Sequence, residues 1–417
     1  MRAAATALLT SVALAGCLQN EQLDLDGDGD TDTDVKDTEE PVELHLDGGV
    51  DLLIVVDNSI SMAQEQKMLE TSVFHLVNSL VNPFGQDFVF PVDDVRAAVV
   101  STNMGFSANG VSGDEYWPGD MVSECQGFGD DGAFQVSTET TVSIETDAIP
   151  CGDALLHCPP DWKCEFGESC IGRCEPPTPG ETELACPELG ESYAETSPEA
   201  PNGDLSLEVA CLSSLGTDGC GFEQQLSSAV RATRRPGQEW FFRDNAALGV
   251  MIVSDEDDCS MRDNAGLFGA DEVADQSQMK INIACGENPE FLLGVEEIVD
   301  ALATVKGGVE EAVFFAAIVG VPPGEVCEGR GDAIAGCLLT PEMQLVPELV
   351  GSTWFFRQAC SRSAGDPPVE VTKAYPGRRF VELAQSFGSR GYVYSICNDD
   401  WMPAMAGFAS IIAPTMY

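Results

Sequence analysis

Three oxygen-bearing side chains follow an apolar run near position 50, and their spacing suits the binding of a hard metal ion. Asp57, Ser59 and Ser61 are spaced Asp-x-Ser-x-Ser and come directly after the run from Leu52 to Val56. One carboxylate and two hydroxyls suit Mg²⁺, which prefers oxygen ligands and keeps several waters. The short pattern is weak by itself, because Asp and Ser are common turn residues. Its position after a buried, strand-like run makes it a candidate metal site.

A second apolar run, later in the chain, also ends in an acidic residue. Residues Ala246 to Ser254 have the composition of a buried strand, and Asp255 follows them. In an open α/β sheet, ligands bind in the crevice at the carboxyl ends of the strands. We therefore expect Asp255 to lie near Asp57. The alternative is a loop whose carboxylates are simply solvated.

The segment 57–61 resembles the metal-ion-dependent adhesion site of von Willebrand factor type A domains. In that family an aspartate and two serines hold a divalent cation, helped by a threonine and a second aspartate from later loops. Asp255 matches the second aspartate, and the resemblance covers about residues 48–101 and 216–417. It implies bound Mg²⁺, or Mn²⁺ or Ca²⁺, whose vacant position takes an acidic side chain from a protein partner.

The threonine that this resemblance requires has no counterpart in register. A simple alignment places Cys220 or Gly221 at its position, before the third helix. Thr217 lies slightly upstream, whereas Glu223 lies slightly downstream and offers a carboxylate oxygen in place of the hydroxyl. Both are candidates for the third loop of the site. The departure also keeps open a second hypothesis, a structural surface protein with a degenerate domain that binds no metal.

Strand-like and helix-like segments alternate around these residues. This alternation predicts an α/β fold with a doubly wound, mainly parallel sheet flanked by helices. An additional edge strand is expected near residues 142–144. The main strands are predicted near residues 52–56, 94–100, 246–254, 313–319 and 391–397, and the helices near 62–80, 226–230, 295–302, 380–387 and 402–412.

The amino-terminal residues predict export and a lipid anchor. Arg2 precedes an apolar run from Ala3 to Ala15, which is too short to span a membrane and suits a signal peptide. The run leads into Leu-Ala-Gly-Cys at 14–17, which resembles a bacterial lipobox and implies acylation of Cys17. No aspartate follows Cys17, so the predicted destination is the outer membrane, on its periplasmic face or at the cell surface. An ordinary secretory signal is the alternative.

Residues 18–45 are predicted to form an acidic, disordered tether. Asp24, Asp26 and Asp28 are spaced like the first half of a calcium loop, but Val35 occupies the position where such loops need a bidentate Glu. The pattern favours a solvated linker, with weak Ca²⁺ binding as the alternative. The remaining residues, 46–417, are predicted to form the domain itself.

Sixteen cysteines indicate an oxidising compartment. Several of them lie in a predicted insertion at about residues 105–215, in which the proline-rich part 175–203 is expected to be irregular. Their spacings are wider than the short knuckles of zinc sites, so disulfides are favoured over zinc. Cys186 and Cys211 flank the densest group, which consists of Cys151, Cys158, Cys164, Cys170 and Cys174.

Charge and composition exclude several classes of function. The chain of 417 residues has 20 basic and 70 acidic residues, a net charge of −50 that disfavours nucleic acid and anionic lipid as direct partners. Its three histidines are His45, His75 and His157, and no Gly-x-Ser-x-Gly is present to suggest a serine hydrolase. The sequence therefore favours a binding protein over an enzyme.

Overall fold

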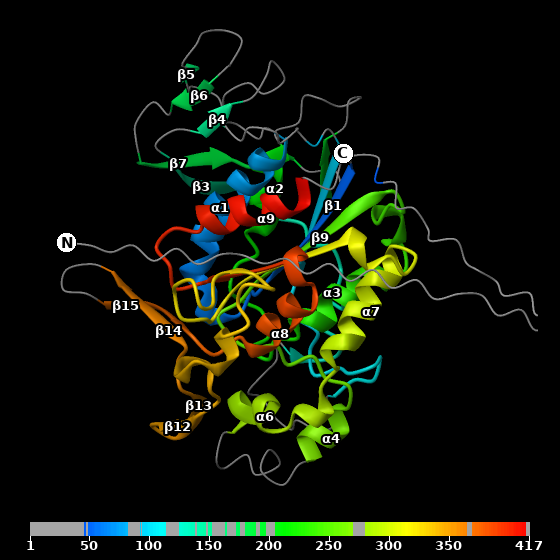
Figure 1. Cartoon of the computed structure of the whole chain (residues 1–417), viewed down its shortest axis with the longest axis vertical. Coiled ribbons are helices and arrows are strands. Elements are labelled where there is room, and N and C mark those ends of the chain that lie inside the picture. The colour runs from blue at the N-terminus through cyan, green and yellow to red at the C-terminus, as the bar shows by residue number, and fades with distance from the viewer. Residues whose placement is uncertain are drawn as a thin grey trace, which may run out of the picture. The chain divides into compact units, whose positions relative to one another are not determined.

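The structure of the protein is a computed structural model. A seven-stranded sheet forms its centre (Figure 1). Its strands are β1 (Gly49–Val56), β2 (Asp94–Ser101), β8 (Tyr193–Thr196), β9 (Ala246–Val253), β10 (Val313–Val319), β11 (Gly329–Arg330) and β16 (Gly391–Ser395). They lie in the order β11-β16-β10-β9-β1-β2-β8. The edge strands β8 and β11 are antiparallel to their neighbours, and the five strands between them are parallel.

The structure describes most of the predicted domain. The described residues are 46, 49–81, 92, 94–113, 125–137, 140–146, 149–151, 163–164, 172–175, 180–188, 192–196, 205–269, 280–364 and 369–413. The predicted signal peptide with Cys17, the acidic tether and its aspartates lie outside them. The side chains of the dense cysteine group at 151–174 also lie outside the described part.

Strand β1 is buried on both faces, which explains its continuous apolar run. Leu52 and Ile54 belong to one core cluster, whereas Leu53 and Val55 belong to a second cluster, because side chains alternate between the faces of a sheet. β1 pairs in parallel with β2 and with β9 along its whole length. The predicted fold class, a doubly wound and mainly parallel sheet flanked by helices, is confirmed.

Six helices cover the two faces of this sheet. Their apolar residues divide between the same two clusters: α1, α2 and α9 contribute to the first, and α3, α7 and α8 contribute to the second (Figure 1). Helix α7 ends where the sequence predicts, because Gly307 and Gly308 adopt φ values of +67° and +87° that favour glycine. The bounds are α1 (Glu65–Val81), α2 (Leu205–Ser213), α3 (Gln225–Arg234), α7 (Val295–Val305), α8 (Arg378–Ser386) and α9 (Met402–Ile412).

Smaller elements surround the main sheet. The strand predicted near residues 142–144 is present, but it pairs with β7 in a separate small sheet. Two short helices, α4 (Asn264–Gly269) and α6 (Ile281–Glu287), follow β9. The small sheets are formed by β3 (Thr141–Thr146) with β7 (Gly180–Ala185), by β4 (Ile149–Cys151), β6 (Gly172–Glu175) and β5 (Lys163–Cys164), by β12 (Pro347–Val350) with β13 (Thr353–Phe356), and by β14 (Cys360–Ala364) with β15 (Val369–Ala374).

The expectation that residues 175–203 are irregular is wrong. This segment contains β7 and β8, and β8 pairs with β2 as an edge of the main sheet. Helix α2 follows it and places Leu205, Val209 and Leu212 in the first core cluster. The predicted insertion at 105–215 therefore contributes two elements to the main domain. A short edge strand is difficult to predict because its pairing partner, β2, is remote in sequence.

Among the described residues, five disulfides join ten cysteines. They indicate a protein that folds outside the cytoplasm. Within the part of the chain described above, no helix combines the length and apolarity that a membrane crossing requires. The pairs are Cys125–Cys220, Cys186–Cys211, Cys259–Cys285, Cys327–Cys337 and Cys360–Cys397.

Candidate functional site

The loop after β1 is organised around the Asp57 carboxylate. The Ser59 backbone N–H donates to Asp57 Oδ1 at 2.9 Å, and the hydroxyls of Ser59 and Ser61 lie 3.0 Å apart. The Asp57 backbone N–H donates to Val253 O at 3.0 Å, which joins this loop to the end of β9. The three side chains that the sequence predicts as metal ligands therefore belong to one hydrogen-bonded group.

The loop after β9 brings the second aspartate into the same group. The Ser61 hydroxyl donates to Asp255 Oδ1 at 3.1 Å, and the Ser254 hydroxyl donates to Asp57 Oδ2 at 2.6 Å. The strands that follow β1 and β9 in the parallel sheet, β2 and β10, lie on opposite sides of this pair. Such a reversal at the carboxyl ends of parallel strands is where open α/β sheets bind ligands.

The spacing of these oxygens is compatible with a small octahedral ion. Adjacent ligands at ~2.0–2.1 Å from Mg²⁺ lie about 3 Å apart when they subtend a right angle. Ser59 Oγ and Ser61 Oγ are separated by 3.0 Å, and Ser61 Oγ and Asp255 Oδ1 by 3.1 Å. Hydrogen bonds alone also account for these separations, so the distances show a fit and nothing more.

Glu223 approaches the cluster from the loop before α3. Its backbone oxygen accepts the Cys259 N–H at 3.1 Å, which ties this loop to the segment after Asp255. The Glu223 residue is only 3% exposed. Burial raises its pKa well above the usual value, and the negative charges of Glu256, Asp57 and Asp255 raise it further. The carboxylate that the sequence offered as a substitute for a hydroxyl therefore lies within electrostatic reach of both aspartates.

Thr217 lies in the same loop but is not joined to the cluster. It is half-buried, and among the described residues no hydrogen bond links its hydroxyl to the predicted ligands. The loop nevertheless contacts the segment after β1, because the Gly219 N–H donates to Asn58 O at 2.8 Å. A Cβ atom on Gly219 would lie 2.1 Å from Asn58 Oδ1, so this close approach requires glycine.

Four buried side-chain oxygens in the described part of the chain lack any hydrogen-bond partner, and all four lie around this cluster. Glu223 Oε1 and Asn58 Oδ1 come from the loops already described. Thr102 Oγ1 comes from the end of β2, where the Thr102 N–H donates to Val56 O at 3.2 Å. Glu65 Oε2 comes from the start of α1, and its carboxylate acts electrostatically on Asp255. Buried polar groups are normally satisfied, so this concentration points to an unseen ligand or to water.

The sequence did not single out Asn58, Glu65 or Thr102 as site residues. A signal existed for Thr102, because it follows the predicted strand 94–100 in the same way that Asp57 follows β1. No comparable signal existed for Glu65, which lies within an amphipathic helical pattern.

Burial and mutual repulsion disfavour the charged forms of these carboxylates. Burial raises the pKa of Asp57, and burial followed by the charges of Asp57 and Glu256 raises the pKa of Asp255 well above its usual value. Burial, followed by the charge of Asp57, raises the pKa of Glu256 to about 7, although a side-chain hydrogen bond with Glu223 and the charge of Lys373 oppose the shift. Among the described ion pairs, none involves Asp57, Asp255, Glu223 or Glu256. The site therefore has a strong excess of negative charge.

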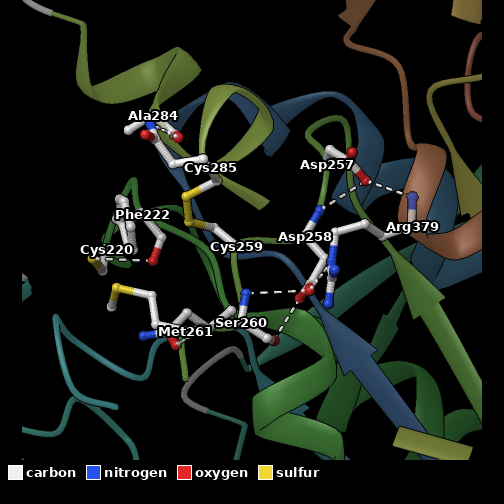
Figure 2. The surroundings of a disulfide bond; sticks show 12 residues. Cys220, Phe222, Asp257, Asp258, Cys259, Ser260, Met261, Ala284, Cys285 and Arg379 are labelled. Atoms are coloured by element: carbon white, nitrogen blue, oxygen red, sulfur yellow. Dashed lines mark hydrogen bonds and ion pairs between the residues drawn. A yellow bond between two sulfur atoms is a disulfide. The ribbon is translucent and has the colours of Figure 1, made fainter. Parts of the chain in front are cut away.

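The next aspartates along the loop are satisfied differently. Arg379 Nε donates to Asp258 Oδ2 at 2.9 Å, and the Arg379 backbone N–H donates to Asp257 Oδ1 at 3.0 Å (Figure 2). Figure 2 also shows the Cys259–Cys285 disulfide, which fastens the end of this acidic loop to α6. The covalent link and the arginine hold the loop at the point where it leaves Asp255.

Among the described residues, no group of three or more His, Cys, Asp or Glu side chains is arranged to hold a metal ion. A metal at this centre would therefore depend on serine hydroxyls together with the carboxylates. In comparisons with known proteins, no family model and no curated protein matches the chain.

Proposed function

We propose that the chain is a binding protein with a von Willebrand factor type A-like domain that holds one divalent cation. The ligands would be Asp57, Ser59, Ser61 and Asp255, with Glu223 in the place where the resembling family has its threonine. The observation that carries the proposal is the coincidence of four unpartnered buried oxygens with carboxylates that lack a cationic partner. A divalent cation with its ordered waters would satisfy both deficits.

The serines and the aspartates would bind the cation in different ways. Ser59 and Ser61 would bind as neutral hydroxyls, while Asp57 and Asp255 would bind directly or through water. A bound Mg²⁺ would supply an open coordination position for an oxygen of a protein partner. Ile60, which is 84% exposed between the two serines, would offer the partner an apolar contact beside that position. We propose an acidic side chain as the partner's ligand, as the resemblance implies.

A structural surface protein without a bound metal is the second candidate. It is supported by the hydrogen bonds among Ser59, Ser61 and Asp255, which satisfy these three side chains without an ion. Metal uptake distinguishes the two candidates.

Calorimetric titration of the purified protein with Mg²⁺, Mn²⁺ and Ca²⁺ tests the metal centre. We expect one ion per chain in the wild type and at least a ~100-fold loss of affinity in Asp57→Ala, because a ligand and a buried charge are both removed. Glu311→Gln is the matched control, since it removes one exposed carboxylate near β10 and should leave uptake unchanged. Equal uptake by wild type and Asp57→Ala would show that the site is elsewhere, and no uptake at all would favour the structural candidate.

We also propose that the exported protein is anchored to the outer membrane by a lipid on Cys17. The support is the lipobox-like end of the apolar amino-terminal run, together with the five disulfides expected of an exported protein. Replacement of Cys17 by Ser should move the protein from the membrane fraction to the soluble fraction. A Cys17→Ser variant that stays in the membrane fraction would rule out this anchor.

A further inference from the structure

A pocket of about 290 Å³ adjoins the candidate metal centre. Glu223 and Glu256, which act electrostatically on the metal-site aspartates, line it, and so does Asp257. Aromatic side chains from the segment 355–375 form another part of the lining. The pocket therefore shares Glu223 with the proposed metal site, and the rest of its lining consists of residues that the metal proposal does not use.

The acidic part of the lining carries more negative than positive charge. Lys373 acts on Glu256 and Arg379 acts on Asp257, whereas the neighbouring charges that act on Glu223 are negative. Glu256 and Asp257 are partly exposed, and Glu223 is buried with Oε1 unpartnered. Within the described part of the chain, none of these three carboxylates forms an ion pair. A pocket lined by three carboxylates, one of which has an oxygen without a hydrogen-bond partner, is suited to a hydrogen-bond donor with positive charge.

The two arginines that line the pocket already form hydrogen bonds within the fold. Arg379 is paired with Asp258, and its NH2 group donates to Leu293 O at 2.6 Å. Arg378 NH1 donates to Met343 O at 2.6 Å and to Leu338 O at 3.4 Å. Neither guanidinium is therefore available to neutralise Glu223 and Glu256.

The aromatic part of the lining is suited to a flat cation. The rings of Phe355 and Tyr375 are stacked, with centroids 5.8 Å apart and an angle of 9° between their planes. Lys373 Nζ lies 5.9 Å from the centroid of Phe355, within the distance of a cation–aromatic contact. A guanidinium can stack on an aromatic face and donate in-plane hydrogen bonds to carboxylates, whereas an ammonium cannot stack.

We propose that this pocket binds an arginine side chain of the protein partner that the metal centre recruits. The existence of a protein partner rests on the proposed function. The choice of an arginine side chain rests on the carboxylates and aromatic rings that line the pocket. It also resolves a difficulty of charge. Asp57, Asp255, Glu223 and Glu256 would carry four negative charges when ionised, and a divalent cation compensates only two. An acidic group on the partner would add to the excess, whereas an accompanying arginine offsets it.

Nα-acetyl-arginine amide and its neutral isostere Nα-acetyl-citrulline amide are suitable probes. Their binding to the purified protein is measured by calorimetry or ligand-observed NMR, first in chelator and then in saturating Mg²⁺. We expect the arginine amide to bind at least about tenfold more tightly than the citrulline amide in both conditions, because only arginine gains the charge-assisted and cation–aromatic contacts.

Two variants test the two parts of the lining. Glu256→Gln should reduce arginine-amide affinity about tenfold and leave citrulline-amide affinity unchanged. Phe355→Leu, which retains apolar bulk, should reduce arginine-amide affinity about threefold. Glu311→Gln is the control for a change of one unit of net charge. Circular dichroism of each variant separates loss of binding from loss of fold.

Equal affinities for the two amides, or an unaltered preference in folded Glu256→Gln, would overturn the pocket proposal. Mg²⁺ uptake is recorded on the same preparations. Uptake without a preference for arginine would refute the pocket alone. A preference for arginine without uptake would refute the metal centre alone and leave the guanidinium site intact.

Discussion

The two ends of strand β1 each carry a fully buried aspartate, and their surroundings are opposite in charge. At the amino end, Asp51 accepts hydrogen bonds from Arg243 Nε at 2.7 Å and from Lys306 Nζ at 3.0 Å. Just beyond the carboxyl end, the Asp57 carboxylate accepts hydrogen bonds from the Ser59 N–H and the Ser254 hydroxyl, which are both neutral donors. Both aspartates have 0% exposure. The two aspartates are thus equally buried, but only the charge of Asp51 is compensated by cationic side chains.

In the proposed function, this difference separates a structural carboxylate from one that binds a ligand. A buried ion costs several kcal/mol unless it is paired and hydrogen-bonded. The Asp51 group meets this requirement within the chain, with Arg243 also pairing with Asp94 at 2.6 Å. At the other end no cation among the described residues is paired with Asp57, and further carboxylates lie nearby. The comparison suggests that stability is concentrated at the amino end of the strand and binding at the carboxyl end.

The largest predicted difference is between Asp51→Asn and Asp57→Asn. Asp51→Asn leaves Arg243 and Lys306 without their shared carboxylate, so the free energy of unfolding should fall by about 3–5 kcal/mol. Asp57→Asn removes a charge that has no cationic partner, so metal-free stability should stay within about 1 kcal/mol of the wild type or rise. Urea denaturation in chelator measures both. A larger loss in Asp57→Asn than in Asp51→Asn would contradict the contrast between the two ends.

A smaller effect is expected from Glu223→Gln. The substitution preserves shape and removes a buried carboxylate whose Oε1 has no hydrogen-bond partner and which is repelled by three others. We expect the free energy of unfolding in chelator, measured at about pH 8, to rise by about 1–3 kcal/mol. The stabilisation that Mg²⁺ provides should diminish at the same time. A destabilised Glu223→Gln variant would indicate that this carboxylate has a partner within the fold.

The smallest predicted effect is a Mg²⁺-sensitive dependence of stability on pH at the acidic end. Asp257, whose pKa burial also raises to about 7, adds to it, whereas His75, whose pKa burial lowers to about 4, opposes it. Burial and neighbouring charge raise the pKa of Glu256 to about 7 and raise those of Asp57, Asp255 and Glu223. For carboxyls whose folded pKa is raised, stability is present below the unfolded pKa and is lost as pH rises through the folded value. In chelator, stability should therefore fall by about 1 kcal/mol from pH 6 to pH 8.

Saturating Mg²⁺ at constant ionic strength should reduce this fall, because the ion favours the ionised carboxylates. Thermal unfolding at the two pH values, with and without Mg²⁺, provides the measurement. The general repulsion expected of a net charge of −50 also changes with pH, and Glu223→Gln controls for it because the variant keeps all the distant charges. A fall of the same size in the presence and absence of Mg²⁺ and in Glu223→Gln would remove the acidic end as its cause.

Much of the central fold could be predicted from local patterns. β1, β9 and β10 are buried on both faces, so each appears in the sequence as an unbroken apolar run with a recognisable end. Helices α7 and α9 also agree with their predicted positions, because their apolar spacing and terminal residues are local features. The edge strand β8 and helix α2 were not predicted, since both depend on packing against remote segments.

The sequence by itself determined the strands of the central sheet and the acidic residues at their ends, because apolar burial and strand termination are local properties of the chain. Tertiary structure alone decided which polar side chains meet there. Parallel strands that are adjacent in space are separated by long crossovers, so the approach of Asp255 to Ser61 spans 194 residues. Glu65, Thr102 and Glu223 are included because the start of α1, the end of β2 and the loop before α3 converge on the same edge. The lack of a hydrogen-bond partner at one side-chain oxygen of each residue is a property of the folded structure alone, because burial there excludes water.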